Sequence, residues 1–240
     1  MTSDKDPLQP LVVAPIARVH SPYREKFGVP RQPGLVSAAS GYLEMLPGYD
    51  LPEAFDGLQG FSHLWVIFGF HQCAGQWKAR VRPPRLGGNR EVGVFASRAP
   101  FRPNNLGLSV LRFEGLETET GVRLAVSGLD LVDGTPVYDI KPYVPYSDSL
   151  PQARGGFADS SPELRLQVEF DPAALQVLRT QPDAGHLREL IEQTLALDPR
   201  PAYRQGDSGE RVYGMQLQDL DVRWRVEDGR VRVVQIVPTR

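Results

Sequence analysis

Short apolar segments separated by Gly and Pro dominate the first part of the chain, up to about residue 150. Residues 11–19 and 41–46 have the composition and length of strands, and turn-forming residues follow each of them. Residues 63–70 form an unbroken apolar and aromatic run, which is typical of a strand buried on both faces. Further strands are predicted at residues 92–96, 108–114 and 122–131. Many short strands without alternating long helices indicate a β-barrel or a β-sandwich.

The pattern changes after residue 150. Residues 150–161 are small and polar, as in a linker. A strand is then predicted at residues 164–170, followed by a helix that begins at Pro172 with Asp171 as its N-cap. A second helix is predicted at residues 186–197, where Leu187, Leu190, Ile191, Thr194 and Leu195 recur at helical spacing. Strands are predicted at residues 212–217, 220–226 and 231–236. We therefore expect a separate α+β domain from about residue 160.

The composition is that of an ordinary globular protein, with 41% hydrophobic and 23% charged residues. The single cysteine, Cys73, excludes an internal disulfide and fits a reducing compartment. No stretch reaches the ~20 apolar residues of a membrane span, and the N-terminus lacks the pattern of a signal peptide. We therefore expect a cytoplasmic protein without membrane contact. No G-x-G-x-x-G follows a strand and no Walker loop is present, which argues against a Rossmann-type cofactor site.

The chemistry-bearing residues do not form a metal site or a hydrolase motif. His63 and His71 would share one face of a strand, but eight residues at strand spacing separate them by ~26 Å. With His20 and His186 elsewhere, one cysteine and no H-x-x-x-H, no metal is predicted. G-x-S-x-G is absent, which argues against a hydrolase triad. Cys73 is more typical of a buried residue than of a nucleophile.

Two stretches combine turn-forming residues with charged side chains and are candidates for binding. Residues 96–109 contain Arg98 and Arg102 among prolines, asparagines and glycines, and residues 130–145 have a similar character. Guanidinium groups suit a carboxylate, a phosphate or a flat ring. Residues 78–102 also carry seven basic side chains and one acid, although the whole chain has a net charge of −2. This local charge fits either contact with RNA or a solvated surface.

These stretches resemble the signature segments of a known family. "FASRAPFRPNNLGLSV" and "LDLVDGTPVYDIKPYVPYSDS" are similar to segments of the TrmO-type (TsaA-like) tRNA methyltransferase family. "SPYREKFGVPRQPGL", "FSHLWVIFGFHQC" and "DPRPAYRQG" agree with it in the same order, so the resemblance spans roughly residues 11–240. One position departs, because Asn105 stands where the family usually has proline. Asn tolerates a left-handed backbone, so we expect the loop to persist with less rigidity.

The resemblance implies a mainly β fold: a single-sheet β-barrel catalytic domain at residues 11–150, then a smaller α+β accessory domain at residues 160–240. It also implies S-adenosylmethionine as cofactor and a homodimer. The residues that would contact the cofactor are Arg31, Gln32, Pro33, His71, Gln72, Arg98, Leu108, Asp133, Gly134, Thr135 and Pro136. In chemical terms, an arginine can meet the methionyl carboxylate, Gln or His can read an adenine edge, and Asp133 can meet an ammonium or a ribose hydroxyl.

The family methylates N6 of threonylcarbamoyl-adenosine at position 37 of threonine-accepting tRNA, which implies an acceptor side to the pocket. The segment DIKPY loosely resembles the Asp-Pro-Pro-Tyr motif of adenine N6-methyltransferases. The candidate catalytic residues are therefore Asp139, Lys141 and Tyr143, with Tyr143 stacking on the base. A strand with a core tyrosine is the alternative interpretation.

The tRNA itself would contact other residues. The candidate substrate-binding residues are Arg102, Asn104 and Arg204, and Arg31 or Arg102 could hold the threonine carboxylate. The C-terminal domain would grip the tRNA stem or pack against a second subunit. Its candidate residues are Arg200, Tyr203, Arg204, Arg223 and Trp224.

Two other functions are compatible with the same sequence. A non-catalytic RNA-binding barrel would bind tRNA but not S-adenosylmethionine. A small-molecule enzyme that uses the arginine-lined pocket, for example on a phosphorylated substrate, would ignore tRNA. Binding measurements with the two ligands separate these functions from a tRNA methyltransferase.

Overall fold

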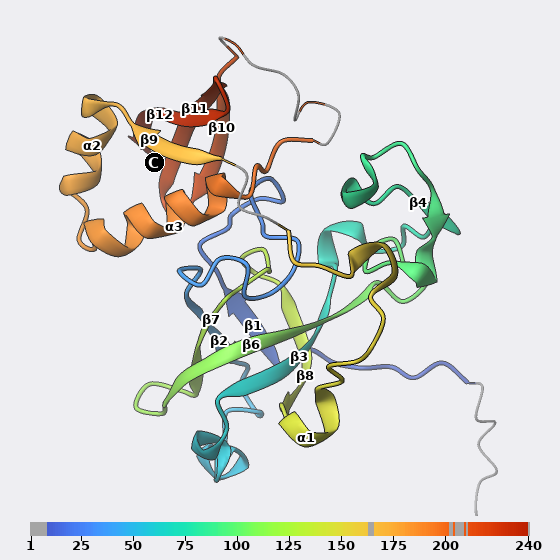
Figure 1. Ribbon diagram of the computed structural model, residues 1–240. Helices are drawn as coiled ribbons and strands as arrows, with labels where there is room; N and C mark the ends of the chain where they lie inside the picture. Colours follow the sequence, from blue (N-terminus) through green and yellow to red (C-terminus); the bar gives the residue numbers. More distant parts are fainter. Residues whose placement is uncertain (1–8, 163–165, 202–203, 205–208, 210, 240) are drawn as a thin grey trace, which may run out of the picture.

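The computed structural model describes residues 9–162, 166–201, 204, 209 and 211–239, and its first part is a closed β-barrel (Figure 1). Within these residues, six strands form the barrel in the order β1-β2-β7-β6-β3-β8, and neighbouring strands are antiparallel. The strands are β1 (Ala17–His20), β2 (Gly41–Met45), β3 (His63–Gly69), β6 (Leu106–Glu117), β7 (Arg123–Ser127) and β8 (Pro136–Pro142). The predicted mainly β fold with a single-sheet barrel is confirmed.

Strand β3 corrects one expectation from the sequence. Leu64, Val66 and Phe68 are buried inside the barrel, whereas Trp65 and Ile67 on the other face are only half-buried. The run is therefore not buried on both faces. In an antiparallel barrel the strands connect without crossover helices, so no layer of helices covers the outside of the sheet.

Strand β8 closes the barrel between β1 and β3, although its residues lie in a stretch that the sequence indicated as a binding segment. The pairing of β3 with β8 shifts register between Ile67 and Phe68, which leaves Tyr138 as a bulge. The Tyr138 ring lies against Gly69, where an added Cβ would come within 2.9 Å of the ring. Glycine at this position therefore leaves room for the Tyr138 ring to pack against β3.

Two predicted strands are shorter in the structure. Residues 11–13 are exposed, and β1 begins only after Pro15, which has no N–H to donate to a sheet. The strand predicted at residues 92–96 is β5 (Val92–Gly93), paired with β4 (Arg80–Val81) in a small hairpin. A 3₁₀ turn follows β5 directly.

The C-terminal region is a sheet with two helices on it. Its described strands are β9 (Gln167–Phe170), β10 (Tyr213–Leu217), β11 (Leu220–Glu227) and β12 (Arg230–Pro238), and its helices are α2 (Pro172–Arg179) and α3 (Ala184–Ala196); α1 (Pro145–Asp148) precedes them. The sheet order is β10-β11-β12-β9, with β9 parallel to β12. All five residues predicted for the buried face of α3 are buried. Asp171 stands at the N-cap of α2 but its side chain makes no cap; it lies 3.7 Å from Arg232 Nε instead.

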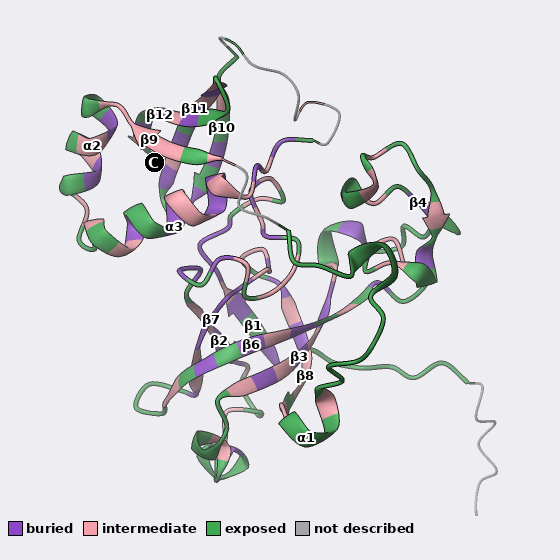
Figure 2. Cartoon of the chain, viewed as in Figure 1, coloured by how far each residue is buried: buried purple, intermediate pink, exposed green. Residues whose placement is uncertain are grey.

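The two regions are packed against each other. Tyr23, in the loop after β1, forms an isolated β-bridge with Leu217, and its hydroxyl lies 3.3 Å from Thr194 Oγ1. The Gln218 amide donates to the Pro22 carbonyl at 2.7 Å. Tyr23 is fully buried, and burial raises the pKa of its phenol above the ordinary value. The buried residues of the barrel strands, of α3 and of the C-terminal sheet belong to one hydrophobic cluster (Figure 2). Because this cluster spans both regions, the division into two domains stays a prediction.

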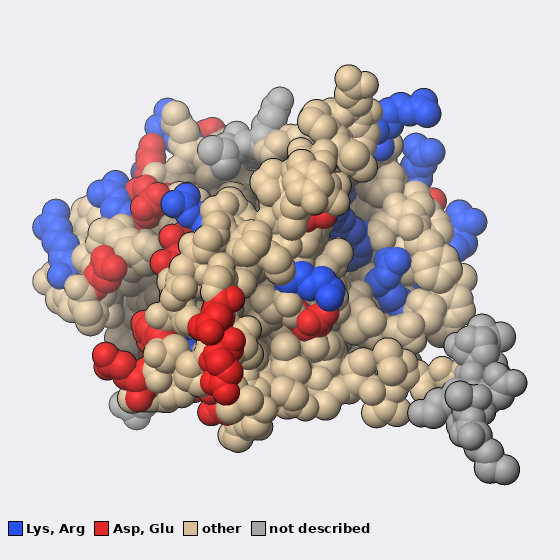
Figure 3. All heavy atoms as spheres, turned by 90° about the horizontal axis from the view of Figure 1, so that it is seen from below, with Lys and Arg blue, Asp and Glu red and all other residues tan. Residues whose placement is uncertain are grey.

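Charge is distributed unevenly over the surface. On the right-hand side of Figure 3, which is the side that carries β4 in Figure 1, Lys and Arg side chains predominate, whereas on the other side acidic side chains are mixed with further Lys and Arg. In the part of the chain that the structure describes, no helix is long and apolar enough to cross a membrane.

Candidate active site

Loops far apart in the sequence meet beside the end of β7. Arg98 Nη1 donates to Gln32 Oε1 at 2.5 Å, which joins the residue 96–109 stretch to the loop before β2. The Gly34 amide donates to the Gly128 carbonyl at 2.9 Å, which joins that loop to the segment after β7. Gly128 has φ +73°, and an added Cβ would lie 3.1 Å from the Gly34 backbone. Glycine is required here because two backbones come together in a left-handed turn.

Asp130, two residues beyond this glycine, is the principal charged group at the site. Its Oδ1 is buried, and no group in the described part of the chain donates a hydrogen bond to it. Burial raises the pKa of the Asp130 carboxyl to about 6. The Ser109 hydroxyl, its own backbone amide and the Arg98 guanidinium act in the opposite direction and do not offset the loss of solvent. A carboxyl with this environment is a functional-site candidate.

The sequence analysis did not single out Asp130, although a signal was present. The residue is the last but one of the predicted strand 122–131, so the sequence places an acidic side chain within an otherwise apolar segment. Charged residues at such positions are rare unless they are paired or functional. Ser109, on the inward face of β6, lies beside it and was likewise passed over as a candidate.

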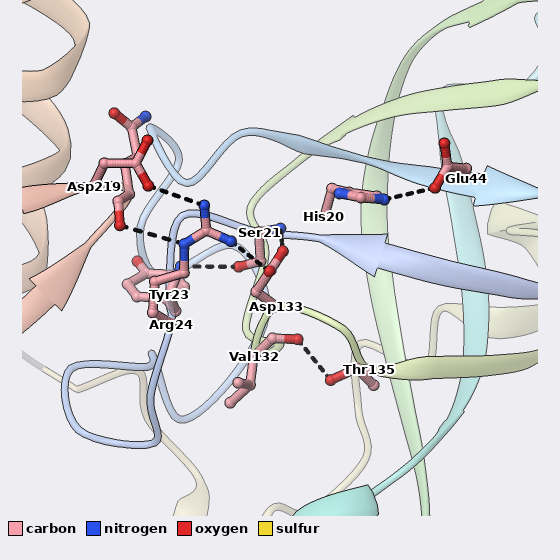
Figure 4. Close-up of polar contacts among 10 residues, drawn as sticks. His20, Ser21, Tyr23, Arg24, Glu44, Val132, Asp133, Thr135 and Asp219 are labelled. Atoms are coloured by element: carbon pink, nitrogen blue, oxygen red, sulfur yellow. Dashed lines mark hydrogen bonds and ion pairs between the residues drawn. The ribbon is translucent and has the colours of Figure 1, made fainter. Parts of the chain in front are cut away.

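Asp133 has a different environment, although it was the predicted ligand for an ammonium or a ribose. Its Oδ1 accepts a hydrogen bond from the Ser21 amide at 2.9 Å, and its Oδ2 pairs with Arg24 Nη1 at 2.5 Å (Figure 4). Arg24 also pairs with Asp219 of the C-terminal region at 3.3 Å and donates to the Gln218 carbonyl. Both carboxylate oxygens are therefore engaged, and Oδ2 joins the two regions through Arg24.

The neighbours of Asp133 are also held by the fold. The Gly134 amide donates to the Val19 carbonyl of β1 at 2.8 Å, and the buried Thr135 hydroxyl donates to the Val132 carbonyl at 2.6 Å (Figure 4). Pro136 begins β8 and pairs in register with Arg18. This turn is thus built against the start of the barrel.

The remaining predicted cofactor residues lie on several surfaces. His71 and Gln72 are exposed in a 3₁₀ turn after β3, where Lys26 Nζ donates to the Gln72 carbonyl at 3.2 Å. Leu108 is 50% exposed on β6, with its side chain on the face opposite the buried Ser109. Arg31 and Pro33 lie beside Gln32 in the loop before β2.

The predicted catalytic residues lie on the outside of the barrel. Asp139 is opposite Ile67 and Lys141 is opposite Trp65, both on the outward face of β3, and Lys141 Nζ pairs with Asp139 Oδ2 at 3.1 Å. Tyr143 follows β8, half-buried, with its ring centre 5.9 Å from that of Trp65. The alternative interpretation, a strand with a core tyrosine, was right about the strand, which is β8. Tyr143 itself follows the strand and is not a core residue.

The predicted substrate-binding residues have three different environments. Arg102 is half-buried, and its Nη1 donates to the Val94 and Ser97 carbonyls at 3.1 and 2.7 Å, so it braces its own loop. Asn104 is exposed. Arg204 is described in a short turn, with its amide donating to the Pro201 carbonyl.

Asn105 adopts the left-handed conformation expected for it, with φ +49°. It is buried, and its side chain accepts from the Gly75 amide and donates to the Gln76 and Pro100 carbonyls. A proline could neither adopt this φ nor make these bonds. The side chain therefore joins its own loop, at Pro100, to the segment after β3, at Gly75 and Gln76, which runs against the expected loss of rigidity.

Two residues predicted to grip tRNA are in the interior. Arg200 is buried and pairs with Asp198 at 2.7 Å, and Trp224 is fully buried in β11 and stacks on Tyr213 with ring centres 4.9 Å apart. These predictions were wrong. Arg200 is held in the interior by its ion pair with Asp198, and Trp224 lies on the inward-facing side of β11. Arg223 is exposed, although it pairs with Asp221. Tyr203 lies outside the described residues.

The site therefore places the Arg98 guanidinium where its charge acts on the half-buried carboxylate of Asp130. Arg98 offers donors to an anion, and Asp130 Oδ1 offers an acceptor to a cation. A zwitterion, such as the amino-acid end of a cofactor, would satisfy both. No group of three or more His, Cys, Asp or Glu that could hold a metal ion occurs among the described residues.

Comparisons with known proteins agree along nearly the whole chain. The family model for the tRNA-methyltransferase O N-terminal domain matches residues 18–149, and that for the TrmO C-terminal domain matches residues 163–239. The chain is 46% identical to the tRNA (adenine(37)-N6)-methyltransferase of Escherichia coli (strain K12) over 226 residues, 93% of this chain and 96% of the relative. It is 52% identical over 217 residues to a putative S-adenosylmethionine-dependent methyltransferase of Pseudomonas aeruginosa, covering 88% of this chain and 91% of that one.

A solved structure agrees as well. The crystal structure of TrmO from Pseudomonas aeruginosa superposes with a TM-score of 0.79 at 43% sequence identity, covering 96% of this chain and 99% of that chain. Fold, sequence and both family models point the same way, and the two alternative functions no longer apply. The chain belongs to the TrmO family of S-adenosylmethionine-dependent tRNA (adenine-37 N6)-methyltransferases.

Proposed function

We propose that this methyltransferase acts on N6 of threonylcarbamoyl-adenosine at position 37 of threonine-accepting tRNA. In unmodified adenosine the lone pair of N6 is drawn into the ring, which makes it a poor nucleophile. In the threonylcarbamoyl form N6 belongs to a urea-like unit between a carbonyl and the ring, so its proton is easier to remove. The threonine also adds a carboxylate, which a site lined by arginines can bind.

The observation that carries the cofactor side of this proposal is the buried, unpartnered Oδ1 of Asp130, on which the charge of Arg98 acts. When bound, S-adenosylmethionine supplies an electrophilic sulfonium methyl group. Arg98 would bind its carboxylate and Asp130 its ammonium, so Asp130 takes the role that the sequence suggested for Asp133. Gln32 holds the guanidinium of Arg98 in place. The remaining cofactor residues predicted by resemblance complete the proposed site.

The acceptor side of the proposal uses the other arginines. Arg31, which is exposed, and Arg102, whose Nη1 also donates to loop carbonyls, are the two candidates for the threonine carboxylate. Asp139, Lys141 and Tyr143 form an adjacent outward surface that would receive the base or its neighbours. With a base stacked on Tyr143, the enzyme's contribution is mainly alignment of the reacting atoms.

Nucleoside mass spectrometry tests the substrate. Threonine tRNA that carries the threonylcarbamoyl group should be methylated, and the same transcript without it should show almost no product, because it lacks the carboxylate whose binding would hold the base in the site. Equal methylation of both RNAs would contradict the carboxylate-recognition proposal. A matched control is Arg31→Lys, which keeps the charge but loses the planar fork.

We also propose that the protein acts as a homodimer in the cytoplasm, where its tRNA substrate occurs. Light scattering coupled to gel filtration measures the mass directly. A mass of one chain at micromolar concentration would contradict the dimer.

A further inference from the structure

The hairpin of β4 and β5 projects from the barrel beside the candidate site (Figure 1). We define the basic lobe as residues 77–102, which include the hairpin and the Arg98 loop. Seven basic residues and one acid give residues 78–102 a formal charge of +6, so the rest of the chain, whose total is −2, carries −8. Positive charge is therefore concentrated on a segment that the barrel core does not need. Its buried valines, Val81 and Val94, lie outside the main hydrophobic core.

Two large aromatic rings are exposed on this lobe. Trp77 is 55% exposed and Phe95 is 74% exposed. The Arg102 guanidinium lies 5.6 Å from the centre of the Phe95 ring, and Lys78 Nζ lies 4.7 Å from the centre of the Phe101 ring. Exposed rings interleaved with cations are the composition of a surface that stacks on bases and contacts phosphates.

The rings are exposed on a backbone that is firmly held. The Gln76 carbonyl accepts from Asn105 Nδ2, and the Lys78 amide donates to the Phe101 carbonyl, so both neighbours of Trp77 are fixed. The Val94 amide donates to the Ala79 carbonyl at 3.0 Å, which fixes the residue before Phe95. The rings are therefore presented at defined positions, and little order has to be created when a ligand stacks on them.

The cations of the lobe are also oriented. Arg80 and Arg82 pair with the two oxygens of the same carboxylate, Glu91, at 3.1 and 3.0 Å. Arg85 donates to the Ser160 carbonyl and hydroxyl, which ties the lobe to the segment after α1. Arg90 is exposed at the end of the hairpin.

We propose that the basic lobe is the docking surface for the anticodon loop, with Trp77 and Phe95 stacking on unpaired bases and the arginines contacting phosphates. The substrate base, at position 37, lies beside the anticodon in a loop of unpaired nucleotides, which suits stacking recognition. The lobe leads directly to the site, because Arg98 belongs to both. This inference rests on the tRNA methyltransferase activity and does not depend on the threonylcarbamoyl group.

The test measures binding of a labelled, unmodified threonine anticodon stem-loop to the full-length protein. Leu replacements at Trp77 and Phe95 keep an apolar side chain and remove the aromatic face. Each should weaken binding about tenfold, and Trp77→Phe should restore most of the affinity. Tyr49→Leu is the matched control, since Tyr49 is 44% exposed in a turn outside the lobe. Affinity for S-adenosylmethionine, measured by calorimetry, should not change.

Salt dependence separates stacking from charge. The Leu variants should keep the wild-type slope of log Kd against log salt, whereas Arg82→Gln and Arg90→Gln should each reduce it by about 0.7–0.9. Wild-type RNA affinity in the Trp77→Leu/Phe95→Leu double variant would overturn the proposal. Loss of RNA binding together with a changed mass in light scattering would overturn it too, because the rings would then cover a contact between subunits.

Discussion

Asp130 and Asp133 lie three residues apart, and both belong to a segment whose motif suggests cofactor binding, yet their surroundings are opposite. Asp133 has a hydrogen-bond or ion-pair partner for each oxygen, and one of them, Arg24, joins the barrel to the C-terminal region. Asp130 has a buried oxygen that accepts no hydrogen bond within the described residues, and burial raises its pKa to about 6. A satisfied carboxylate stabilises the fold, whereas an unsatisfied buried one costs stability and is retained where a ligand completes it.

The largest expected effect is on folding stability. Because the folded pKa of Asp130 is raised from 3.8 to about 6, the folded state binds the proton more tightly than the unfolded state. The contribution of Asp130 to folding stability should therefore fall as pH rises from about 4 to 6, by on the order of 3 kcal/mol. Asp130→Asn removes this charge, so it should be more stable than wild type by that amount at pH 8 and similar at pH 4. Urea unfolding at both pH values measures this; a less stable variant at pH 8 would show that Asp130 is structurally satisfied.

The same substitution should weaken the binding of the cofactor. Asp130→Asn and Arg98→Ala should each reduce the affinity for S-adenosylmethionine by ~1.5–3 kcal/mol, the range for losing a charge-assisted contact. Calorimetry gives the affinity, and circular dichroism checks the fold. Wild-type affinity in both variants would remove the pair from the cofactor site. Together with the previous result, this predicts that Asp130→Asn is more stable than wild type at pH 8 but binds S-adenosylmethionine more weakly.

Much of this contrast could not be predicted from the sequence. Strand positions and the buried face of α3 followed from periodicity, because burial is enforced locally along a strand or helix. The motif located the segment that contains both aspartates. Which of the two is satisfied depends on Arg24 and on Asp219, far away in sequence and in the other region, and such a pairing leaves no local pattern. Burial of Arg200 depends likewise on its pairing with Asp198 in a turn with positive φ.

The pH dependence of cofactor binding sharpens the comparison further. An ammonium binds the ionised carboxylate, so affinity should be constant above about pH 7 and fall as Asp130 becomes protonated. With a free-state pKa of about 6, binding at pH 5 should be about tenfold weaker than on the plateau. The charged and titratable groups that influence Asp130 include Arg98 and Tyr23, and burial raises the pKa of the Tyr23 phenol, so it stays neutral in this range. Calorimetry across this pH range measures the affinity for S-adenosylmethionine, and in Asp130→Asn that affinity should not fall between pH 7 and pH 5.

The smallest effect is expected at Asp133. Asp133→Asn keeps an oxygen for the Ser21 amide and loses only the ion pair with Arg24, whose side chain is 42% exposed and so is partly screened by water. We expect a loss of about 1 kcal/mol or less in folding stability, of opposite sign to that of Asp130→Asn, and a change of less than about threefold in cofactor affinity. Arg24→Gln, which breaks the pair from the other side, should reproduce both results. Because the two aspartates share one segment, a large loss of cofactor affinity in Asp133→Asn but not in Arg24→Gln would show that Asp133 touches the cofactor directly. The cofactor would then replace Arg24 as the partner of Asp133. Both carboxylates would bind the cofactor, and they would differ only in how exposed they are without it.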